Sequence, residues 1–374
     1  MSPDKAAFTS VEICAGAGGQ ALGLERAGFD HELLIEVDPN ACATLRHNRP
    51  HWNVRETDLR DYVESGEALG LRGKVDLLAG GVPCPPFSLA GKQLGRDDER
   101  DLFPTMVKLA GQLDPPAVMI ENVRGLMQSK FDDYRQEIID ELGELGYVCS
   151  WRELQASDFG VSQLRPRSIL VALKPEVWAH FDAEGWHLPL DNQEPALSVG
   201  HLLAESMQKR GLKGQRFKDW FDKASKDIAP TLVGGSKKHG GADLGPSRAK
   251  STWSRLGVSG LGVADEPDEN GRTKNPNRDL GAGEKGLPMI TVRQAAMVQG
   301  FIPEGKEDEW IFKGRKTAAY RQVGNAFPPP VAKAVGLQII NALKAYGEET
   351  GVASQVVLPT PAGPSATEAA LAGS

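Results

Sequence analysis

The sequence has few cysteines and no long apolar run. Its 4 cysteines lie far apart in 374 residues, with no CxxC pair and no histidine beside them at the spacing of a zinc site. We therefore expect no disulfide framework, no bound metal and a reducing, cytoplasmic location. No stretch approaches the roughly 20 apolar residues that cross a bilayer, and residues 1–10 lack the pattern of a signal peptide. These absences exclude a membrane protein.

Positive charge is also scarce over the whole chain. Lys and Arg number 43 against 50 Asp and Glu, a net charge of −7, which disfavours nucleic acid as a partner because phosphate binding needs clustered cations. The distribution is uneven, however. Residues 201–260 contain 12 basic and 5 acidic residues, a local charge of +7 that leaves −14 for the remainder. This basic central region keeps nucleic acid open as a partner.

Short apolar runs alternate with amphipathic helical patterns over the first 175 residues. This alternation is typical of βαβ units and predicts an α/β fold with a parallel sheet. The elements expected are strands at residues 8–13, 32–37, 75–79 and 117–120, helices at 20–27, 40–47 and 132–145, and a closing pair of strands at 147–154 and 169–173. The length of the chain suggests two domains.

The pattern changes after residue 189. Residues 190–290 are rich in Gly, Lys and Asp and show little periodicity, which predicts either a loop-built second domain or partial disorder. Helical patterning returns at residues 291–298 and 331–346. Residues 351–374 hold no Lys or Arg and many Ala, Pro, Ser and Thr, so we expect a disordered tail there.

A glycine-rich turn follows the first predicted strand. Residues 14–19 read Cys-Ala-Gly-Ala-Gly-Gly and open a helix, so backbone N–H groups there can approach an anionic or carboxylate-bearing ligand. Glu36 ends the next strand, a position where an acid can bind ribose hydroxyls, and Asp58 is another acid at the end of the third strand. Such a turn alone is also common as a purely structural feature. With the two acids it predicts a nucleotide-like cofactor, without separating a dinucleotide from S-adenosylmethionine.

Cys84 lies on a loop directly after the apolar strand 75–79. Residues 80–88 read Gly-Gly-Val-Pro-Cys-Pro-Pro-Phe-Ser and leave the sheet at its carboxyl edge, where α/β proteins bind their ligands. A free cysteine is most often a buried structural residue. The flanking prolines and glycines favour a held loop instead, and they predict that Cys84 is a nucleophile.

Three charged residues follow at the same edge. Glu121 ends an apolar strand in Ile-Glu-Asn-Val, where it is a candidate helix cap, ribose ligand or, beside a nucleophile, general acid. Arg165 and Arg167 lie two apart in Gln-Leu-Arg-Pro-Arg, and extended residues at that spacing point to the same side. We expect both arginines to reach one anionic site; the alternative is a solvated surface pair.

In this order the clusters resemble the motifs of the DNA cytosine-5 methyltransferases. The correspondence comprises the glycine-rich turn, Glu-Val-Asp at 36–38, Pro-Cys, Glu-Asn-Val and Gln-x-Arg-x-Arg, and it continues at 291–301 and 321–330. It covers roughly residues 8–175 and 287–345 and leaves the stretch between them as the family's variable region. Several motifs in the right order are highly specific, whereas any one of them alone is not.

The resemblance implies an α/β fold, a Rossmann-like S-adenosylmethionine-dependent methyltransferase sheet with a smaller, irregular target-recognition domain. The implied domains are a catalytic and cofactor domain at 1–188 completed by 312–347, a target-recognition domain at 189–290, a motif nine junction at 291–311, and a tail at 348–374.

The resemblance also assigns the cofactor site. The residues expected to bind S-adenosylmethionine are Cys14, Ala15, Gly16, Ala17, Gly18, Gly19, Glu36, Val37, Asp58, Leu59 and Asn325. Cys14 and Val37 stand where the family usually carries aromatic residues against the adenine. In motif nine, Gln294 replaces the usual Glu and Met297 the usual Arg, in a motif thought to brace the recognition region. The expected product is S-adenosylhomocysteine, and no metal takes part.

By the same resemblance, the reaction proceeds by covalent catalysis. The Cys84 thiolate adds to C6 of cytosine, C5 becomes nucleophilic and takes the methyl group, and Cys84 is eliminated as the C5 proton is lost. Glu121 bonds the N3/N4 edge and protonates N3, while Arg167, with Arg165 near it, meets the O2 side. A base inside a duplex is beyond the reach of Cys84, so the target cytosine is expected to be flipped out.

DNA contacts are expected in two places. The residues are Ser88, Lys92, Gln93 and Arg100 in a closing loop after the nucleophile, and Lys237, Lys238, Arg248 and Lys250 in the variable region. Phe217, Trp220 and Phe221 stand there at helical spacing and predict a small core. The implied partners are double-stranded DNA and a cognate restriction endonuclease, and the chain is expected to be a monomer.

Three other functions fit parts of the pattern. A tRNA cytosine methyltransferase shares the fold, but the long variable region favours DNA. A catalytically silent DNA-binding relative is disfavoured by the intact set of Cys84, Glu121, Arg165 and Arg167. A dehydrogenase explains the glycine-rich turn but leaves Cys84 and Glu121 without a role.

Overall fold

A seven-stranded sheet forms the centre of the first lobe, in the strand order β3-β2-β1-β4-β5-β8-β6. The computed structural model of the chain describes residues 8–83, 101–189, 193–234, 242–268, 272–281, 286–302 and 309–350. The strands are β1 (Phe8–Ile13), β2 (Phe29–Glu36), β3 (Val54–Glu56), β4 (Leu77–Gly80), β5 (Ala117–Val123), β6 (Val148–Gln155) and β8 (Pro166–Leu173). β1 to β5 are parallel, and β8 is antiparallel to both of its neighbours. The predicted parallel sheet and its closing pair of strands are confirmed.

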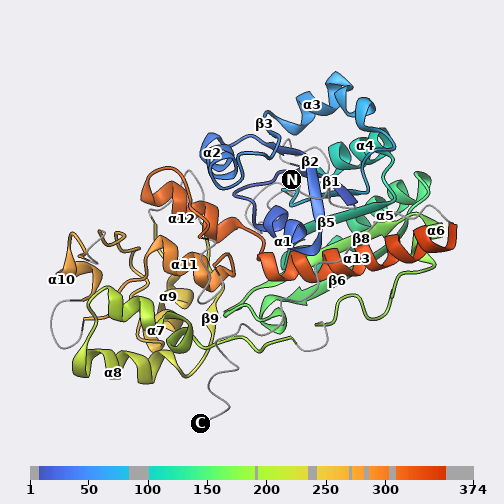
Figure 1. Ribbon diagram of the computed structural model, residues 1–374. Helices are drawn as coiled ribbons and strands as arrows, with labels where there is room; N and C mark the ends of the chain where they lie inside the picture. The colour runs from blue at the N-terminus through green and yellow to red at the C-terminus, as the bar shows by residue number, and fades with distance from the viewer. Residues whose placement is uncertain are drawn as a thin grey trace, which may run out of the picture.

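Helices cover both faces of this sheet, as Figure 1 shows. α3, α4 and α5 bury apolar side chains against one face, and α1, α6 and α13 against the other. The bounds are α1 (Gly19–Ala27), α2 (Pro39–Asn48), α3 (Leu59–Ser65), α4 (Phe103–Leu113), α5 (Asp132–Glu144), α6 (Pro175–Trp178) and α13 (Pro329–Thr350). Short 3₁₀ turns are η1 (Glu67–Leu71), η3 (Arg124–Met127), η4 (Ser129–Phe131) and η5 (Ala156–Phe159).

The last described helix, α13, packs tightly on the first. A Cβ atom on Gly23 would lie 2.4 Å from the Pro329 carbonyl oxygen, and one on Gly336 would lie 2.7 Å from the Leu24 side chain. Glycine at these two positions therefore permits the close approach of α1 and α13. The C-terminal segment thus completes the lobe that the N-terminal strands begin.

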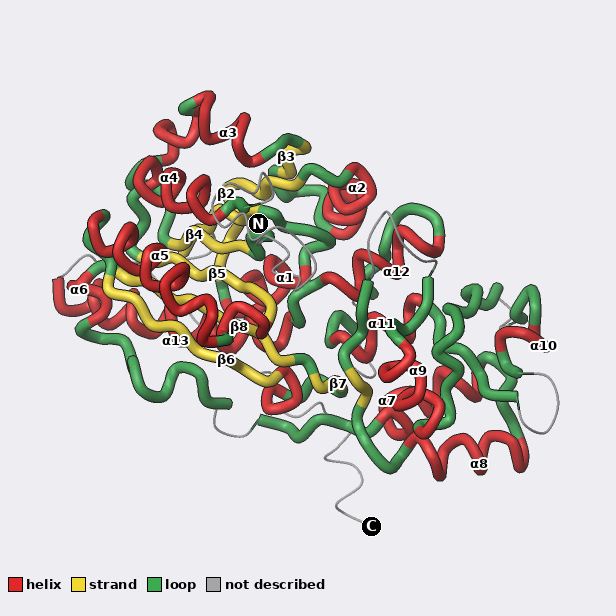
Figure 2. The backbone as a smooth tube through the Cα atoms, turned by 180° about the vertical axis from the view of Figure 1, so that it is seen from behind, coloured by secondary structure: helices red, strands yellow, loops and turns green. Residues whose placement is uncertain are grey.

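A second lobe lies beside the sheet (Figure 2). Its elements are α7 (Val199–Lys209), α8 (Gly214–Ala224), β9 (Ala229–Pro230), α9 (Ser247–Arg255), α10 (Pro276–Asp279) and α11 (Val292–Gln299), followed by α12 (Lys316–Asn325). β9 pairs in parallel with β7 (Gln163–Leu164).

The expectation of a loop-built or partly disordered stretch is wrong for α7, α8 and α9. These helices bury narrow apolar faces around Trp220 and Trp253, and the many charged residues on their outer faces obscure the period. The predicted small core is confirmed, because Phe217 and Phe221 pack against the same cluster.

One hydrophobic cluster continues from the first lobe into the second. It contains Trp52 of the first lobe, Trp310 between the lobes, and Leu203 and Trp253 of the second. The indole N–H of Trp310 also donates a hydrogen bond of 2.9 Å to the Ala17 carbonyl in the glycine-rich turn. The second lobe is therefore packed directly behind that turn.

None of the helices in the described ranges is both long and apolar enough to cross a membrane. No group of three or more His, Cys, Asp or Glu side chains in these parts of the chain is arranged to hold a metal ion.

Candidate active site

The glycine-rich turn between β1 and α1 takes a conformation that favours glycine. Gly16 and Gly18 have φ values of 53° and 85°, in the left-handed region where a Cβ atom is costly. Cys14 lies in the same region at φ 49°, which is unusual for a residue with a side chain. The turn ends at the N-terminus of α1. The backbone N–H groups in the first turn of that helix point where an anionic group can bind.

Glu36 ties this turn to the end of β2. One carboxylate oxygen, Oε2, accepts a hydrogen bond of 2.7 Å from the Gly16 N–H, and Oε1 accepts from the N–H groups of Val37 and Asp38 at 2.9 and 2.7 Å. The carboxylate is nearly buried, so these charge-assisted bonds fix both loops at the carboxyl edge of the sheet.

A cavity of about 290 Å³ lies over the turn. Of the predicted cofactor residues, it is lined by Cys14, Ala15, Gly16, Ala17, Gly19, Glu36 and Asn325. The others, Gly18, Val37, Asp58 and Leu59, lie outside this lining. Val37 is an exposed residue beside it, and Asp58 caps α3 by accepting from the Arg60 N–H at 2.8 Å. Burial, with the nearby charges of Glu36 and Asp58, raises the pKa of Cys14 to about 12, so this thiol stays neutral.

Glu12 and Gln20 also line this cavity, although neither belongs to the residues predicted from the sequence to bind the cofactor. Both side chains are buried, Glu12 completely, and no polar atom of either has a hydrogen-bond partner within the described chain. Burial raises the pKa of Glu12 to about 8. The available signal was a single acid within the apolar strand β1. Buried polar atoms without partners indicate that a ligand completes their hydrogen bonds.

Without cofactor, Glu12 makes stability fall as pH rises. Its folded-state pKa of about 8 exceeds the ordinary 4.5, so the fold holds a proton that the unfolded chain releases. The contribution of Glu12 to the free energy of unfolding is fully present below pH 4.5, and it is lost as pH rises through 8. We expect Glu12→Gln to remove a slope approaching about 1.4 kcal/mol per pH unit. Urea unfolding at pH 5, 6.5 and 8 measures this, and parallel curves for wild type and variant would contradict it.

Buried His31 affects the pH dependence of stability with the opposite sign to Glu12. It is present in both wild type and Glu12→Gln. It contacts the Ser10 hydroxyl through Nδ1 at 2.6 Å, and burial lowers its pKa to about 4. Its contribution is present above pH 6.5 and is lost as pH falls through 4. Because wild type and Glu12→Gln share this residue, its effect cancels in their difference.

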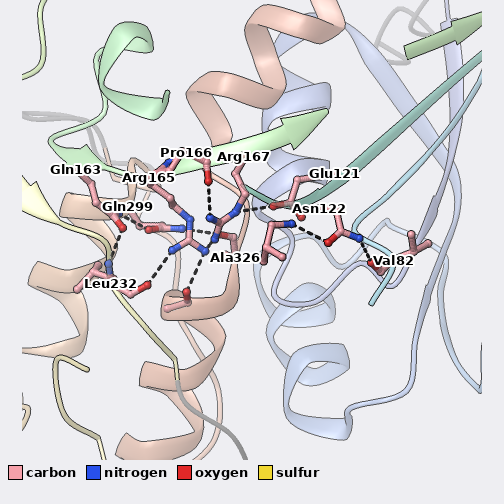
Figure 3. A network of polar contacts seen from close by, with 12 residues as sticks. Val82, Glu121, Asn122, Gln163, Arg165, Pro166, Arg167, Leu232, Gln299 and Ala326 are labelled. Carbon is pink, nitrogen blue, oxygen red and sulfur yellow. Dashed lines mark hydrogen bonds and ion pairs between the residues drawn. The ribbon is translucent and has the colours of Figure 1, made fainter. Parts of the chain in front are cut away.

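Glu121 and Arg167 form an ion pair at the end of β5. Arg167 Nε lies 2.6 Å from Glu121 Oε1, and the two side chains are only 12% and 13% exposed. The antiparallel register of β5 and β8 places Arg167 across from Val123, two residues beyond Glu121 and on the same face (Figure 3). The sheet therefore presents a carboxylate and a guanidinium side by side.

Asn122 supports the loop that leads to the predicted nucleophile. Its Nδ2 donates a buried hydrogen bond of 2.9 Å to the Val82 carbonyl, just after β4. Pro83 is the last described residue of this loop. The predicted site residues outside the described ranges are Cys84, Ser88, Lys92, Gln93 and Arg100 in the first gap and Lys237 and Lys238 in a later one.

A second cavity, of about 890 Å³, opens over the ion pair of Glu121 and Arg167. It is lined by Pro83, Glu121 and Arg167, and also by Gln128 and Lys130, which are not among the predicted site residues. Three residues, Gly81, Glu121 and Asn325, line both this cavity and the cavity over the glycine-rich turn. The two cavities therefore adjoin at the carboxylate of Glu121 and the side chain of Asn325.

Arg165 lines the same cavity as Arg167 but makes different contacts. It is 1% exposed, and its guanidinium donates to three backbone carbonyls, those of Leu232, Gly324 and Ala326. The two arginines are neighbours, as the spacing predicted, but only Arg167 contacts an acid.

The remaining predicted DNA contacts lie on α9. Arg248 is exposed there, whereas Lys250 is half-buried, with its ammonium 2.8 Å from the Asp243 carboxylate.

Gln294 of motif nine joins α11 to α7. Its Oε1 accepts from Arg210 Nη1 at 2.6 Å, and its Nε2 donates to Ser206 Oγ at 3.0 Å. Arg210 is buried. We expect Gln294→Ala to lower the free energy of unfolding by about 1.5–3 kcal/mol, because it removes a hydrogen bond to a buried charge. Gln294→Glu keeps an acceptor and is expected to retain wild-type stability or more. Denaturant titration compares the two, and equal losses would contradict this role.

Comparisons with known proteins agree with this geometry. The family model for C-5 cytosine-specific DNA methylase matches residues 8–341. The chain is 52% identical over 340 residues to Type II methyltransferase M.NaeI of Lentzea aerocolonigenes, covering 90% of this chain and 76% of that protein. It is 50% identical over 344 residues to Type II methyltransferase M.NgoMIV of Neisseria gonorrhoeae, covering 90% and 98%. A mutant of Spodoptera frugiperda DNMT2 shares the fold, with a TM-score of 0.59 and 18% identity over 89% of this chain and 99% of that one.

These matches confirm the Rossmann-like fold of S-adenosylmethionine-dependent methyltransferases. They also confirm the enzyme class, a DNA cytosine-5 methyltransferase. The chain belongs to the C-5 cytosine-specific DNA methylase family.

Proposed function

We propose that the chain transfers a methyl group from S-adenosylmethionine to C5 of a flipped-out cytosine in a specific duplex DNA sequence, through a covalent bond between Cys84 and C6. The observation that carries this proposal is the junction of the two cavities. Gly81, Glu121 and Asn325 line both, so a cofactor in one and a base in the other are in contact there. Methyl transfer requires this proximity.

The residues of the smaller cavity fit S-adenosylmethionine. The turn at the N-terminus of α1 suits the carboxylate of the methionine part, and the unpartnered carboxylate of Glu12 and amide of Gln20 suit its ammonium. Glu36 Oε2 accepts one hydrogen bond from the described part of the chain, which leaves a lone pair for a ribose hydroxyl. When bound, the cofactor supplies an electrophilic methyl group, and its product is S-adenosylhomocysteine. No metal is needed for this chemistry.

Cys84 makes the cytosine nucleophilic. Its thiolate forms a bond to C6, the electron pair of the C5–C6 double bond shifts to the C4–C5 bond, and the pair of the C4–N3 double bond moves to N3, which takes a proton from Glu121. C5 then forms the bond to the methyl carbon, while the bond from that carbon to the sulfonium sulfur breaks and leaves its electron pair on sulfur. The C5 proton passes to solvent, its bonding pair forms the C5–C6 double bond, and the S–C6 bond breaks to restore the thiolate. N3 returns its proton to Glu121, which restores the aromatic ring. Asn122 supports the attack of Cys84 by holding the Val82 carbonyl at the start of the loop that carries Cys84.

Glu121 and Arg167 hold the base during these steps. N3 and O2 are adjacent on one edge of cytosine, and the ion pair presents a carboxyl group and a guanidinium side by side. In the proposed reaction, Glu121 bonds N3 and N4 and moves the proton at N3. Arg167 donates to O2, where negative charge grows as C6 is attacked.

DNA binding supplies the rest of the specificity. We assign target recognition to residues 189–290, with Arg248 and Lys250 as phosphate or groove contacts, and the completed catalytic domain to residues 1–188 and 312–347. The base is flipped because Cys84 attacks a ring face that stacking covers in a duplex. A restriction endonuclease that reads the same sequence is the matching partner, and the enzyme acts as a monomer in the cytoplasm.

Methyl transfer from radiolabelled S-adenosylmethionine tests the substrate. We expect label in duplex DNA and none in tRNA, because the long variable region between the motifs favours DNA as the substrate. Label in tRNA alone would replace the proposal with the tRNA alternative. Label in neither would favour a catalytically silent relative.

A further inference from the structure

Arg165 is a buried arginine that contacts main chain rather than an acid. Its Nη1 donates to the Leu232 carbonyl at 2.9 Å, and its Nη2 donates to the Gly324 and Ala326 carbonyls at 3.0 and 2.9 Å (Figure 3). These bonds direct its Nη donors away from the Glu121 carboxylate. Burial and the neighbouring Arg167 lower the pKa of Arg165.

The three carbonyls belong to two segments that meet in the active site. Gly324 and Ala326 flank Asn325, which lines both cavities. Leu232 belongs to residues 231–234, which follow β9 and line the larger cavity. A single guanidinium therefore holds the backbone on either side of Asn325 and the edge of the second lobe.

These segments are also in direct contact with each other. A Cβ atom on Gly324 would lie 2.4 Å from the Gly234 nitrogen, and one on Gly234 would lie 2.4 Å from Asn325 Oδ1. Glycine at both positions permits this contact. A small shift of either segment therefore moves the side chain of Asn325.

Two buried glutamines tie the same segments a second time. Gln163 Oε1 accepts from the Leu232 N–H at 2.7 Å, and its Nε2 donates to Gln299 Oε1 at 2.5 Å. Gln299 in turn donates to the Ala326 carbonyl. The network joins β7, α11, the end of α12 and the segment that follows β9. A buried, hydrogen-bonded network of this kind favours a single arrangement of these elements.

We propose that Arg165 is a positioning residue that acts through Asn325. It fixes the backbone around Asn325 and residues 231–234 relative to the Glu121–Arg167 pair, and it does not contact the base. The inference rests on the proposed function and on the prediction from the sequence that Asn325 binds S-adenosylmethionine. The fork of the guanidinium reaches carbonyls on two segments at once, and a lysine ammonium cannot span them.

Binding of S-adenosylhomocysteine without DNA tests this role, because a residue that only contacts the base leaves that affinity unchanged. We expect Arg165→Lys to weaken binding by roughly 5- to 100-fold, since it leaves buried carbonyls without donors. The matched control is Arg167→Lys, two residues away, which is expected to lower kcat and to leave cofactor affinity within about 2-fold of wild type. Unchanged affinity in Arg165→Lys with a fall in kcat would overturn the inference.

A double-mutant cycle separates positioning from general destabilisation. In an Asn325→Ala background, Arg165→Lys is expected to cause little further loss of affinity, because its effect passes through Asn325. Additive losses would overturn the inference. If Arg165→Lys does not fold, Gly324→Ala takes its place, because its Cβ atom presses on Gly234 and displaces the same contact. Unchanged affinity in that variant would equally overturn it. Failure of the wild type to bind S-adenosylhomocysteine would instead refute the proposed function.

Discussion

Cys84→Ser is expected to abolish methyl transfer, lowering kcat by at least roughly 1,000-fold. A cysteine thiol is partly ionised near neutral pH, whereas a serine hydroxyl is not. The variant therefore cannot add to C6. Initial rates with a labelled methyl donor and duplex DNA measure the loss. Cofactor and DNA affinities are expected to stay close to those of the wild type, because the substitution changes a single atom.

Cys149→Ser is the matched control for this variant. Cys149 lies on β6, and burial raises its pKa to about 12, so it holds no thiolate near neutral pH. We expect wild-type activity. A duplex with 5-fluorocytosine at the target gives a second readout, because fluorine at C5 cannot leave as a proton does. Wild type should then stay bound to DNA in denaturing gels and Cys84→Ser should not. Equal methyl transfer by Cys84→Ser and wild type would contradict the mechanism.

Glu121→Gln is expected to lower kcat by roughly 100- to 10,000-fold, the usual contribution of a positioned general acid. The amide can still hydrogen-bond the edge of the base, but it cannot protonate N3. The substitution also leaves Arg167, which is 12% exposed, without its counter-charge. Single-turnover kinetics at saturating DNA and cofactor isolate this chemical step.

Glu153→Gln is the control for the loss of an ion pair as such. Glu153 pairs with Arg124 at 3.2 Å, but the two side chains are 36% and 68% exposed. An exposed pair contributes little, so we expect no change in kcat and little in stability. If Glu121→Gln matched Glu153→Gln in rate, Glu121 would have no part in proton transfer.

The first lobe could be predicted from its sequence because its signals are local. β1 has the predicted bounds of 8–13, and the antiparallel pair β6 and β8 closes the sheet as expected. Apolar runs and helical periods reflect burial on one sheet, and the glycine-rich turn, Glu36 and Glu121 come at or near the carboxyl ends of strands. Parallel strands bring their carboxyl ends to one edge, so the order of motifs alone placed Glu36 and Glu121 there.

The second lobe and the contacts of Arg165 could not be predicted in the same way. Its helices bury a few aromatic residues such as Trp220 and Trp253 and carry charge elsewhere, which weakens the periodic signal. Alternation correctly placed Arg165 and Arg167 on one side of the chain. It gave no information on partners such as Gly324, because these lie far away in the sequence and become neighbours only when the lobes pack.

The most direct test of the account is to sequence methylated cytosines in DNA from a host that expresses the enzyme. The account predicts 5-methylcytosine at one base of one short recurring sequence, and its absence from a host that expresses Cys84→Ser. Methylation on another atom or base, equal methylation in the Cys84→Ser host, or no methylation of DNA by an enzyme that labels tRNA would contradict it.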